Sequence, residues 1–116
     1  MSGATQFHYL ALDLVDSAEK IAEYQRLHQQ IWPEVITHLR QHGVVNMEIY
    51  RLGNRLFMVM EVHQHFDAEQ FAEAAQRNPD IQRWEALMWQ FQQPTPWTPA
   101  GEKWVAMDRI FSLHDQ

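Results

Sequence analysis

The sequence predicts an α+β domain with the ferredoxin-like order β-α-β-β-α-β, in which helices cover one face of an antiparallel sheet. Three local patterns carry this prediction: two capping-box sequences that start helices, a two-residue turn between two apolar segments, and an extended stretch toward each end. The chain has 116 residues, of which 46% are hydrophobic, so it can bury its own core. We therefore expect residues 1–116 to form a single domain.

The first predicted strand covers residues 6–15, QFHYLALDLV, and has one mostly apolar face. Asp16 followed by Glu19 matches a capping box, which predicts that a helix starts here and runs toward His42. Gly43 follows as the glycine that commonly ends a helix. These signals place a long helix directly after the first strand.

A proline interrupts this helix. Pro33 has no N–H to donate, and it disfavours helical geometry at the residue before it. We therefore predict a kink or a short break near Ile31–Trp32, which would free backbone groups at that point.

The next two strands are predicted to form a hairpin. Residues 44–52 (VVNMEIYRL) and 55–63 (RLFMVMEVH) both have strand patterns, and Gly53-Asn54 between them matches a two-residue turn. Glycine in the first position is typical of a type II′ turn, whose twist suits the paired strands. We therefore expect antiparallel pairing of these two segments.

A second helix follows the hairpin. Asp67 with Gln70 repeats the capping-box pattern, and Asn78-Pro79 interrupts the helix before it resumes to about Gln92. Its expected apolar stripe consists of Ile81, Trp84, Met88 and Phe91. Glu85 lies at the edge of this stripe, where its carboxylate can hydrogen-bond a ligand or simply face solvent.

The predicted sheet carries apolar residues on both faces. Phe7 and Tyr9 fall on one face of the first strand, and Leu10 and Leu12 fall on the other. Because the helices cover only one face, the second face needs a partner chain or a lined cavity. The usual arrangement that combines both is a dimeric α/β barrel, so we expect a homodimer.

The C-terminal segment can connect the two subunits of such a dimer. PTPWTP, residues 94–99, is extended because its three prolines exclude a helix, and residues 103–113 are predicted as a last strand. An extended arm of this kind can carry the last strand to the partner subunit. Deletion of residues 103–116 is therefore expected to abolish dimerisation.

Charge and composition exclude several classes of function. The net charge of −6 and the pI of about 5.5 disfavour nucleic acid or an anionic membrane as a partner. The absence of cysteine excludes disulfides, thiolate nucleophiles and cysteine zinc sites. Signal-peptide features and membrane-length apolar runs are missing, so we expect a cytoplasmic protein. Phosphate-binding loops and serine-nucleophile motifs are missing too, so phosphate cradling and serine-triad chemistry are unsupported.

One pair of histidines has a spacing that can hold a metal. His38 and His42 are four residues apart, but no HExxH pattern or clear third ligand accompanies them, and His38 falls outside the apolar stripe of its helix. No metal site is predicted.

Another histidine lies within the apolar stripe of the first helix. In EYQRLHQQIWPEV, residues 23–35, His28 follows Tyr24 by one turn and precedes Trp32 by one turn. At about 100° per residue, it projects into a stripe formed by Ile21, Tyr24, Ile31 and Val35. Two interpretations follow: a core histidine with a nearby hydrogen-bond partner, or a functional histidine close to the predicted helix break.

The same stretch resembles the L-rhamnose mutarotase family through the rather specific core YxxxHxxxWPE. The resemblance continues in matching order through HGVVNMEIY (42–50), RLFMVMEV (55–62) and QRWEALM (82–88), and so covers nearly the whole chain. It implies a homodimeric enzyme that interconverts the α and β pyranose anomers of a 6-deoxy-hexose without a cofactor.

The resemblance also implies roles for individual residues. His28 is expected to act as the acid that protonates the ring oxygen, and Tyr24 to contact the sugar or relay a proton. Trp84 is expected to stack on the apolar face of the sugar. Glu85 stands where the family has a second tryptophan, and we expect it to accept hydrogen bonds from sugar hydroxyls or to serve as the base. The remaining residues expected to bind substrate are Met47 and Trp32.

Two positions depart from the family pattern. The family has a tyrosine on the second strand where this chain has Met47, and a second tryptophan where this chain has Glu85. The first change removes a hydroxyl and the second adds a carboxylate. Because an unpaired buried polar group costs about 1–3 kcal/mol, a pocket altered in this way is expected to recognise a different pattern of sugar hydroxyls. L-Fucose is also a 6-deoxy-L-hexose but has a different hydroxyl stereochemistry, so these changes favour it over L-rhamnose as the substrate.

Two other classes of function stay open on the sequence alone. One is a monooxygenase with a dimeric α+β barrel, which is cofactor-free or degrades haem. The other is a non-catalytic sugar-binding module, which would saturate with sugar and leave anomer exchange at its spontaneous rate.

Overall fold

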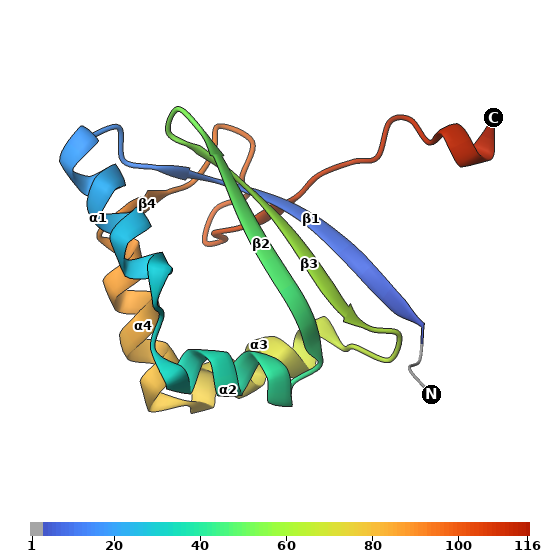
Figure 1. Cartoon of the computed structure of the whole chain (residues 1–116), viewed down its shortest axis with the longest axis horizontal. Coiled ribbons are helices and arrows are strands. Elements are labelled where there is room, and N and C mark those ends of the chain that lie inside the picture. The colour runs from blue at the N-terminus through green and yellow to red at the C-terminus, as the bar shows by residue number, and fades with distance from the viewer. Residues whose placement is uncertain (1–3) are drawn as a thin grey trace.

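Residues 4–116, which the computed structural model describes, fold into a twisted antiparallel sheet with four α-helices on one side (Figure 1). The strands are β1 (Thr5–Leu14), β2 (Val44–Leu52), β3 (Arg55–His63), β4 (Gln92–Gln93) and β5 (Val105–Ala106). The helices are α1 (Ala18–Gln29), α2 (Pro33–Gln41), α3 (Ala68–Arg77) and α4 (Pro79–Trp89), followed by the short 3-10 helix η1 (Leu113–Asp115). The predicted α+β class is confirmed.

The sheet is organised around β1. This strand pairs antiparallel with β3 from Thr5 to Asp13, and β3 pairs with β2 on its other side. The second edge of β1 receives two short strands, with β4 opposite Leu14 and β5 opposite Leu10. The main strand order is therefore β2-β3-β1-β4, with β5 beside the same edge of β1.

The predicted hairpin between β2 and β3 is confirmed. Gly53 has a φ of +59°, and among residues 4–116 positive φ occurs only at glycines, so Asn54 has the negative φ that a type II′ turn requires. Asn54 also ties the turn to β1: its side-chain amide donates to the carbonyl oxygen of Leu14 at 3.0 Å, and its own carbonyl accepts from Leu14 N–H at 2.6 Å.

The break predicted near Ile31–Trp32 is confirmed as well. Helix α1 ends at Gln29 and α2 begins at Pro33, where a missing N–H has no cost because the first turn of a helix lacks acceptors for it. The break lets α2 turn sharply away from the direction of α1 (Figure 1). The helices therefore form an angled wall opposite the sheet.

Polar side chains cap the other helix starts. Asp67 accepts hydrogen bonds from two backbone N–H groups of α3, as predicted, and Asn78 does the same for α4 at the predicted interruption. The predicted cap of the first helix is wrong by one residue. Ser17 rather than Asp16 is the cap, because its extended backbone brings its hydroxyl to the N–H of Lys20.

The predicted last strand is wrong over most of its length. Of residues 103–113, only Val105–Ala106 form a strand on β1, after which the chain leaves the sheet and Ile110 is 95% exposed (Figure 1, red end). The pattern is typical of a strand, but a strand also needs a partner backbone.

The second helix also ends before its predicted limit, because the chain after Trp89 turns to pair Gln92–Gln93 with β1.

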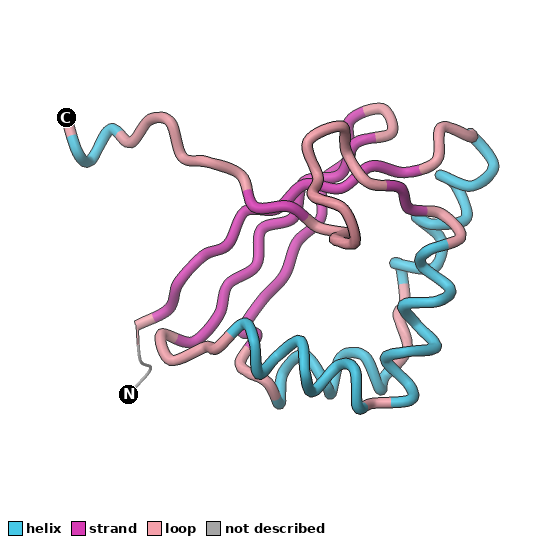
Figure 2. Tube along the Cα trace, turned by 180° about the vertical axis from the view of Figure 1, so that it is seen from behind, coloured by secondary structure: helices cyan, strands magenta, loops and turns pink. Residues whose placement is uncertain are grey.

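Both faces of the sheet are apolar, as predicted. The face toward the helices supplies core residues, including Leu12, Leu14, Leu56, Met58 and Val62. The opposite face carries four neighbouring aromatic rings, the open-face ladder, formed by Phe7, Tyr9, Phe57 and Tyr50. Figure 2 shows α1 to α4 together on one side of the sheet, with the C-terminal segment extending away from them. Within residues 4–116, no helix has both the length and the apolar character needed to cross a membrane.

Candidate active site

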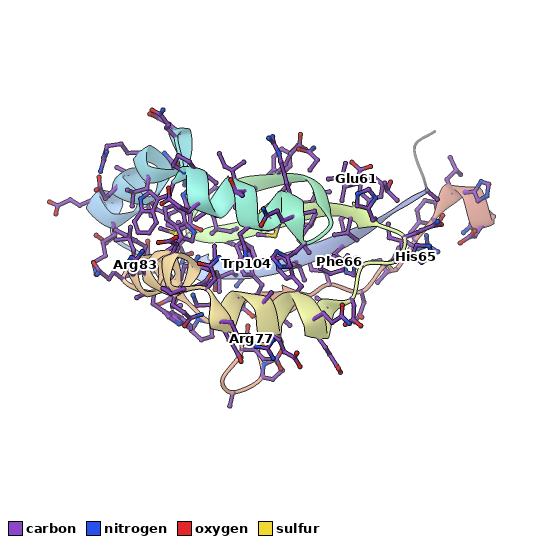
Figure 3. All side chains as sticks on the ribbon, turned by 90° about the horizontal axis from the view of Figure 1, so that it is seen from below. Glu61, His65, Phe66, Arg77, Arg83 and Trp104 are labelled. Atoms are coloured by element: carbon purple, nitrogen blue, oxygen red, sulfur yellow. The ribbon has the colours of Figure 1, made fainter. Side chains whose placement is uncertain are left out.

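A cavity of about 490 Å³ lies between the sheet and the helices. Its wall is mostly apolar, with Leu10 and Met58 from the strands, Trp84 from α4 and Trp104 from the segment before β5. In Figure 3, Trp104 and Phe66 both lie between helices α2 and α3. The polar lining residues are His8, Tyr24, His38, Glu85 and Gln92. A mostly apolar cavity of this size with a few polar groups is typical of a small-molecule site.

Tyr24 brings a buried hydroxyl to this cavity from α1. Its side chain is only 3% exposed, and its hydroxyl oxygen accepts a hydrogen bond from the Gln92 amide at 3.1 Å. Burial raises the pKa of Tyr24 to about 12 because the charged phenolate would lose its hydration. The hydroxyl is therefore protonated near pH 7 and can donate a hydrogen bond to a ligand.

His28 packs directly on the ring of Tyr24. The two ring centroids lie 4.2 Å apart, and His28 also meets Trp84 edge-on at 5.6 Å. Its Nδ1 lies 2.7 Å from the backbone oxygen of Tyr24. Because a carbonyl oxygen only accepts, Nδ1 carries the proton and Nε2 of the neutral ring carries a lone pair.

The surroundings of His28 favour this neutral form. Burial lowers the pKa of His28 below its ordinary value of 6.5, and the contact with the Tyr24 carbonyl opposes that shift only in part. The ring is therefore mostly unprotonated near pH 7, with Nε2 available as a base.

His28 is not one of the residues that line the cavity; it lies behind the lining residues Tyr24 and Trp84, whose rings it contacts. It lines two smaller depressions, of about 350 and 440 Å³, between the first two helices and β2. Ile49 lines both depressions and also the larger cavity, while Tyr24 lines the cavity and one depression. The structure therefore brings His28 against the residues that form the cavity wall.

Two predicted tryptophans have different positions. Trp84 is 93% buried by its neighbours and lines the cavity, as a platform for a ligand requires. Trp32 is not among the lining residues; it packs edge-on against Trp84 with ring centroids 5.1 Å apart. Trp32 therefore supports the platform from behind instead of facing a ligand.

Glu85 lines the cavity but its carboxylate already has a partner. Lys103 Nζ lies 2.5 Å from its Oε2, and the same ammonium group lies 4.5 Å from the centre of the Trp89 ring. Lys103 precedes Trp104, so the ion pair holds this wall residue close to α4. The ion pair makes Glu85 a part of the wall and occupies one of its two carboxylate oxygens.

Met47, the remaining predicted binding residue, is half-buried and lines the cavity from β2. Gln92, Trp104 and His38 are among the lining residues that were not predicted to bind substrate. His38 was placed outside the apolar stripe, yet it is only 3% exposed. The prediction was wrong because His38 follows the buried Val35 by three positions, so the two side chains share the inward face of α2.

The histidine pair of α2 lacks the partners of a metal site. The rings of His38 and His42 lie 4.4 Å apart, and His42 Nδ1 donates to the backbone oxygen of His38 at 2.8 Å. Across residues 4–116, the His, Cys, Asp and Glu side chains form no group of three or more that could hold a metal ion.

Comparison with known proteins shows the family of this chain. The family model described as L-rhamnose mutarotase matches residues 8–113. An L-fucose mutarotase of Xanthomonas campestris pv. campestris is 45% identical over 106 residues, which cover 90% of this chain and 85% of the relative. An L-rhamnose mutarotase of Oceanobacillus iheyensis is 30% identical over 83% of this chain and 86% of that protein.

A solved structure shares the fold. The crystal structure of an L-rhamnose mutarotase from Formosa agariphila superimposes with a TM-score of 0.66, at 22% sequence identity, over 93% of this chain and 98% of that one. The match to the family model over nearly the whole chain agrees with the resemblance of EYQRLHQQIWPEV. The chain belongs to the L-rhamnose mutarotase family.

Proposed function

We propose that the protein is a mutarotase that interconverts the α and β pyranose anomers of a 6-deoxy-L-hexose, and that it prefers L-fucose to L-rhamnose. Family membership supports the reaction, and the 45% identity to an L-fucose mutarotase supports the preference. The structural observation that carries the proposal is a neutral His28 packed on the buried, protonated Tyr24 beside a mostly apolar cavity.

The proposed reaction requires two proton transfers. A base removes the proton from O1 while C1=O1 forms and the C1–O5 bond breaks, and O5 gains a proton. Rotation about C1–C2 exposes the other face of the aldehyde, and ring closure runs the same steps in reverse. Every atom and proton is conserved, so the reaction consumes no co-reactant.

His28 and Tyr24 fit these two transfers. The lone pair on His28 Nε2 can take the O1 proton, and the resulting imidazolium can return a proton as the acid. The sequence-based expectation gave His28 the role of acid; the protonated Nδ1 and the lowered pKa favour its entering the reaction as the base. The Tyr24 hydroxyl donates a hydrogen bond to O5 and so stabilises the negative charge that develops there as the C1–O5 bond breaks.

The cavity wall suits a 6-deoxy sugar. Trp84 offers an aromatic surface for the apolar face of the ring, and Leu10, Met47 and Met58 offer an apolar environment for the C6 methyl group. Glu85 is proposed to accept a hydroxyl hydrogen bond with the carboxylate oxygen that Lys103 leaves free. Trp32 contributes indirectly, by holding Trp84 in place.

We also propose that the protein is a homodimer with the ferredoxin-like sheet order. The order β2-β3-β1-β4 supports the fold, and the exposed open-face ladder supports a second copy packed against the sheet. A cytoplasmic location stays a prediction of the sequence.

Magnetisation-transfer NMR on the anomeric protons tests the proposed function. The protein is expected to speed exchange between the α and β signals of L-fucose, and of L-rhamnose to a smaller degree. Saturable binding of both sugars with exchange at the spontaneous rate would instead indicate a sugar-binding module. A coloured preparation that binds haem and leaves both sugars unaffected would favour the monooxygenase class.

The rate of exchange should depend on pH through His28. Because the pKa of His28 is lowered, the basic form dominates above about pH 6.5, and kcat/KM should be constant there. It should fall as pH drops through the lowered pKa, because protonation removes the lone pair. Enzyme-free exchange is measured at each pH and subtracted. A rate that rises as the pH falls below 6.5 would show that His28 enters as the acid.

A further inference from the structure

Gln92 is a buried amide in the wall of the cavity. It is only 7% exposed and lies in β4, where pairing with Leu14 of β1 holds its backbone. The backbone oxygen of the preceding Phe91 also accepts a hydrogen bond from Val15 N–H at 2.8 Å. The side chain therefore extends into the cavity from a fixed piece of backbone.

One end of this amide is paired and the other is not. Nε2 donates to the Tyr24 hydroxyl oxygen at 3.1 Å, whereas Oε1 is buried and has no hydrogen-bond partner among residues 4–116. Turning the amide over would exchange the two ends but would still leave one of them unpaired. In either orientation, a polar group beside the cavity lacks a partner within the protein.

A buried unpaired polar group is costly, and native proteins usually satisfy it. The carbonyl end of an amide needs an O–H or N–H donor, and a sugar supplies hydroxyl donors. Because Tyr24 accepts from Gln92, its own proton is free to point toward the sugar. Gln92 and Tyr24 together thus offer an acceptor and a donor side by side.

We propose that Gln92 is a specificity-determining residue that holds the Tyr24 hydroxyl in place with one end of its amide and binds a sugar hydroxyl with the other. This inference rests on the proposed mutarotase function and adds a residue that the family resemblance does not supply. Met47 lines the same cavity without a strong hydrogen-bonding group, so Gln92 is one of the few residues that can distinguish hydroxyl patterns there.

The variant Gln92→Met tests the proposal because it keeps the length of the side chain and removes both hydrogen-bonding groups. We expect KM for L-fucose to rise about tenfold or more and kcat to fall less. L-Fucose analogues that each lack one hydroxyl are measured in parallel. The analogue without the hydroxyl that Gln92 binds should show nearly the same KM with wild type and variant.

Gln93→Met is the matched control. Gln93 is the neighbouring residue of β4, is half-buried and is not a lining residue of the cavity, so its variant should keep both kinetic constants. An unchanged KM for L-fucose in a folded Gln92→Met, or an equal rise for every analogue, would overturn the proposal. If Gln92→Met does not fold, Gln92→Leu is measured in the same way.

The wild-type measurement separates this inference from the proposed function. If wild type exchanges neither sugar above the spontaneous rate, the function itself fails. If wild type is active and the Gln92 variants keep its KM and its ratio of L-fucose to L-rhamnose activity, only the role of Gln92 fails. A purely structural role would lower the melting temperature and leave KM unchanged.

Discussion

Replacing His28 with asparagine is expected to slow catalysed exchange between the anomers of L-fucose by about 10²–10⁴-fold, the usual contribution of a positioned acid–base group. Asparagine retains a side-chain N–H that can donate to the Tyr24 backbone oxygen, as His28 Nδ1 does at 2.7 Å. It lacks the second ring nitrogen. The variant therefore removes the proposed base while keeping the local hydrogen bond, and NMR magnetisation transfer measures the loss.

His42→Asn provides the matched control for this prediction. His42 also donates through Nδ1 to the backbone oxygen four residues earlier, at 2.8 Å, but it lies exposed near the end of α2 and does not line the cavity. Its replacement should leave the exchange rate unchanged. Wild-type exchange in a folded His28→Asn would make His28 a core histidine, the other interpretation of its position in the apolar stripe.

The double variant Tyr9→Glu, Phe57→Glu is expected to convert the proposed dimer into monomers. These two rings stack at the centre of the open-face ladder, with centroids 6.2 Å apart. In a dimer packed through this face, each subunit would bury two unpaired carboxylates, and the like charges would repel across the symmetry axis. Light scattering at several concentrations measures the change from twice the chain mass to the mass of one chain.

Gln76→Glu on α3 adds the same kind of charge to an exposed helix position and should keep the dimer. A double variant that stays dimeric would place the interface elsewhere.

The C-terminal segment needs a narrower deletion than the sequence suggested. Trp104 lines the cavity and Lys103 pairs with the lining residue Glu85, so deletion of residues 107–116 tests the arm without removing that wall.

Local signals in the sequence were sufficient for much of the fold. Gly53-Asn54 predicted its turn, Asp67 and Asn78 predicted the starts of helices, and Pro33 predicted the break between α1 and α2. Each of these features depends on the backbone preferences of residues adjacent in the chain, so no knowledge of distant contacts is needed.

Features that depend on distant partners were missed. Residues 103–113 have the pattern of a strand, but only two of them pair with β1. Gln92 lies in a polar stretch that carries no signal, and it enters the cavity only because β4 pairs with the end of β1. His38 was also misplaced: it shares a face of α2 with Val35 and packs against Phe71 of α3.

The candidate site divides in the same way. The sequence alone identified the helical face that carries Tyr24 and His28, and the stripe that carries Trp84, because helical periodicity decides which side chains share a face. Only the tertiary structure decided the protonation of His28, the pairing of Glu85 with Lys103 and the unpaired amide of Gln92. The first of these properties depends on burial in the folded protein, and the other two depend on contacts between residues far apart in the chain, which no local pattern encodes.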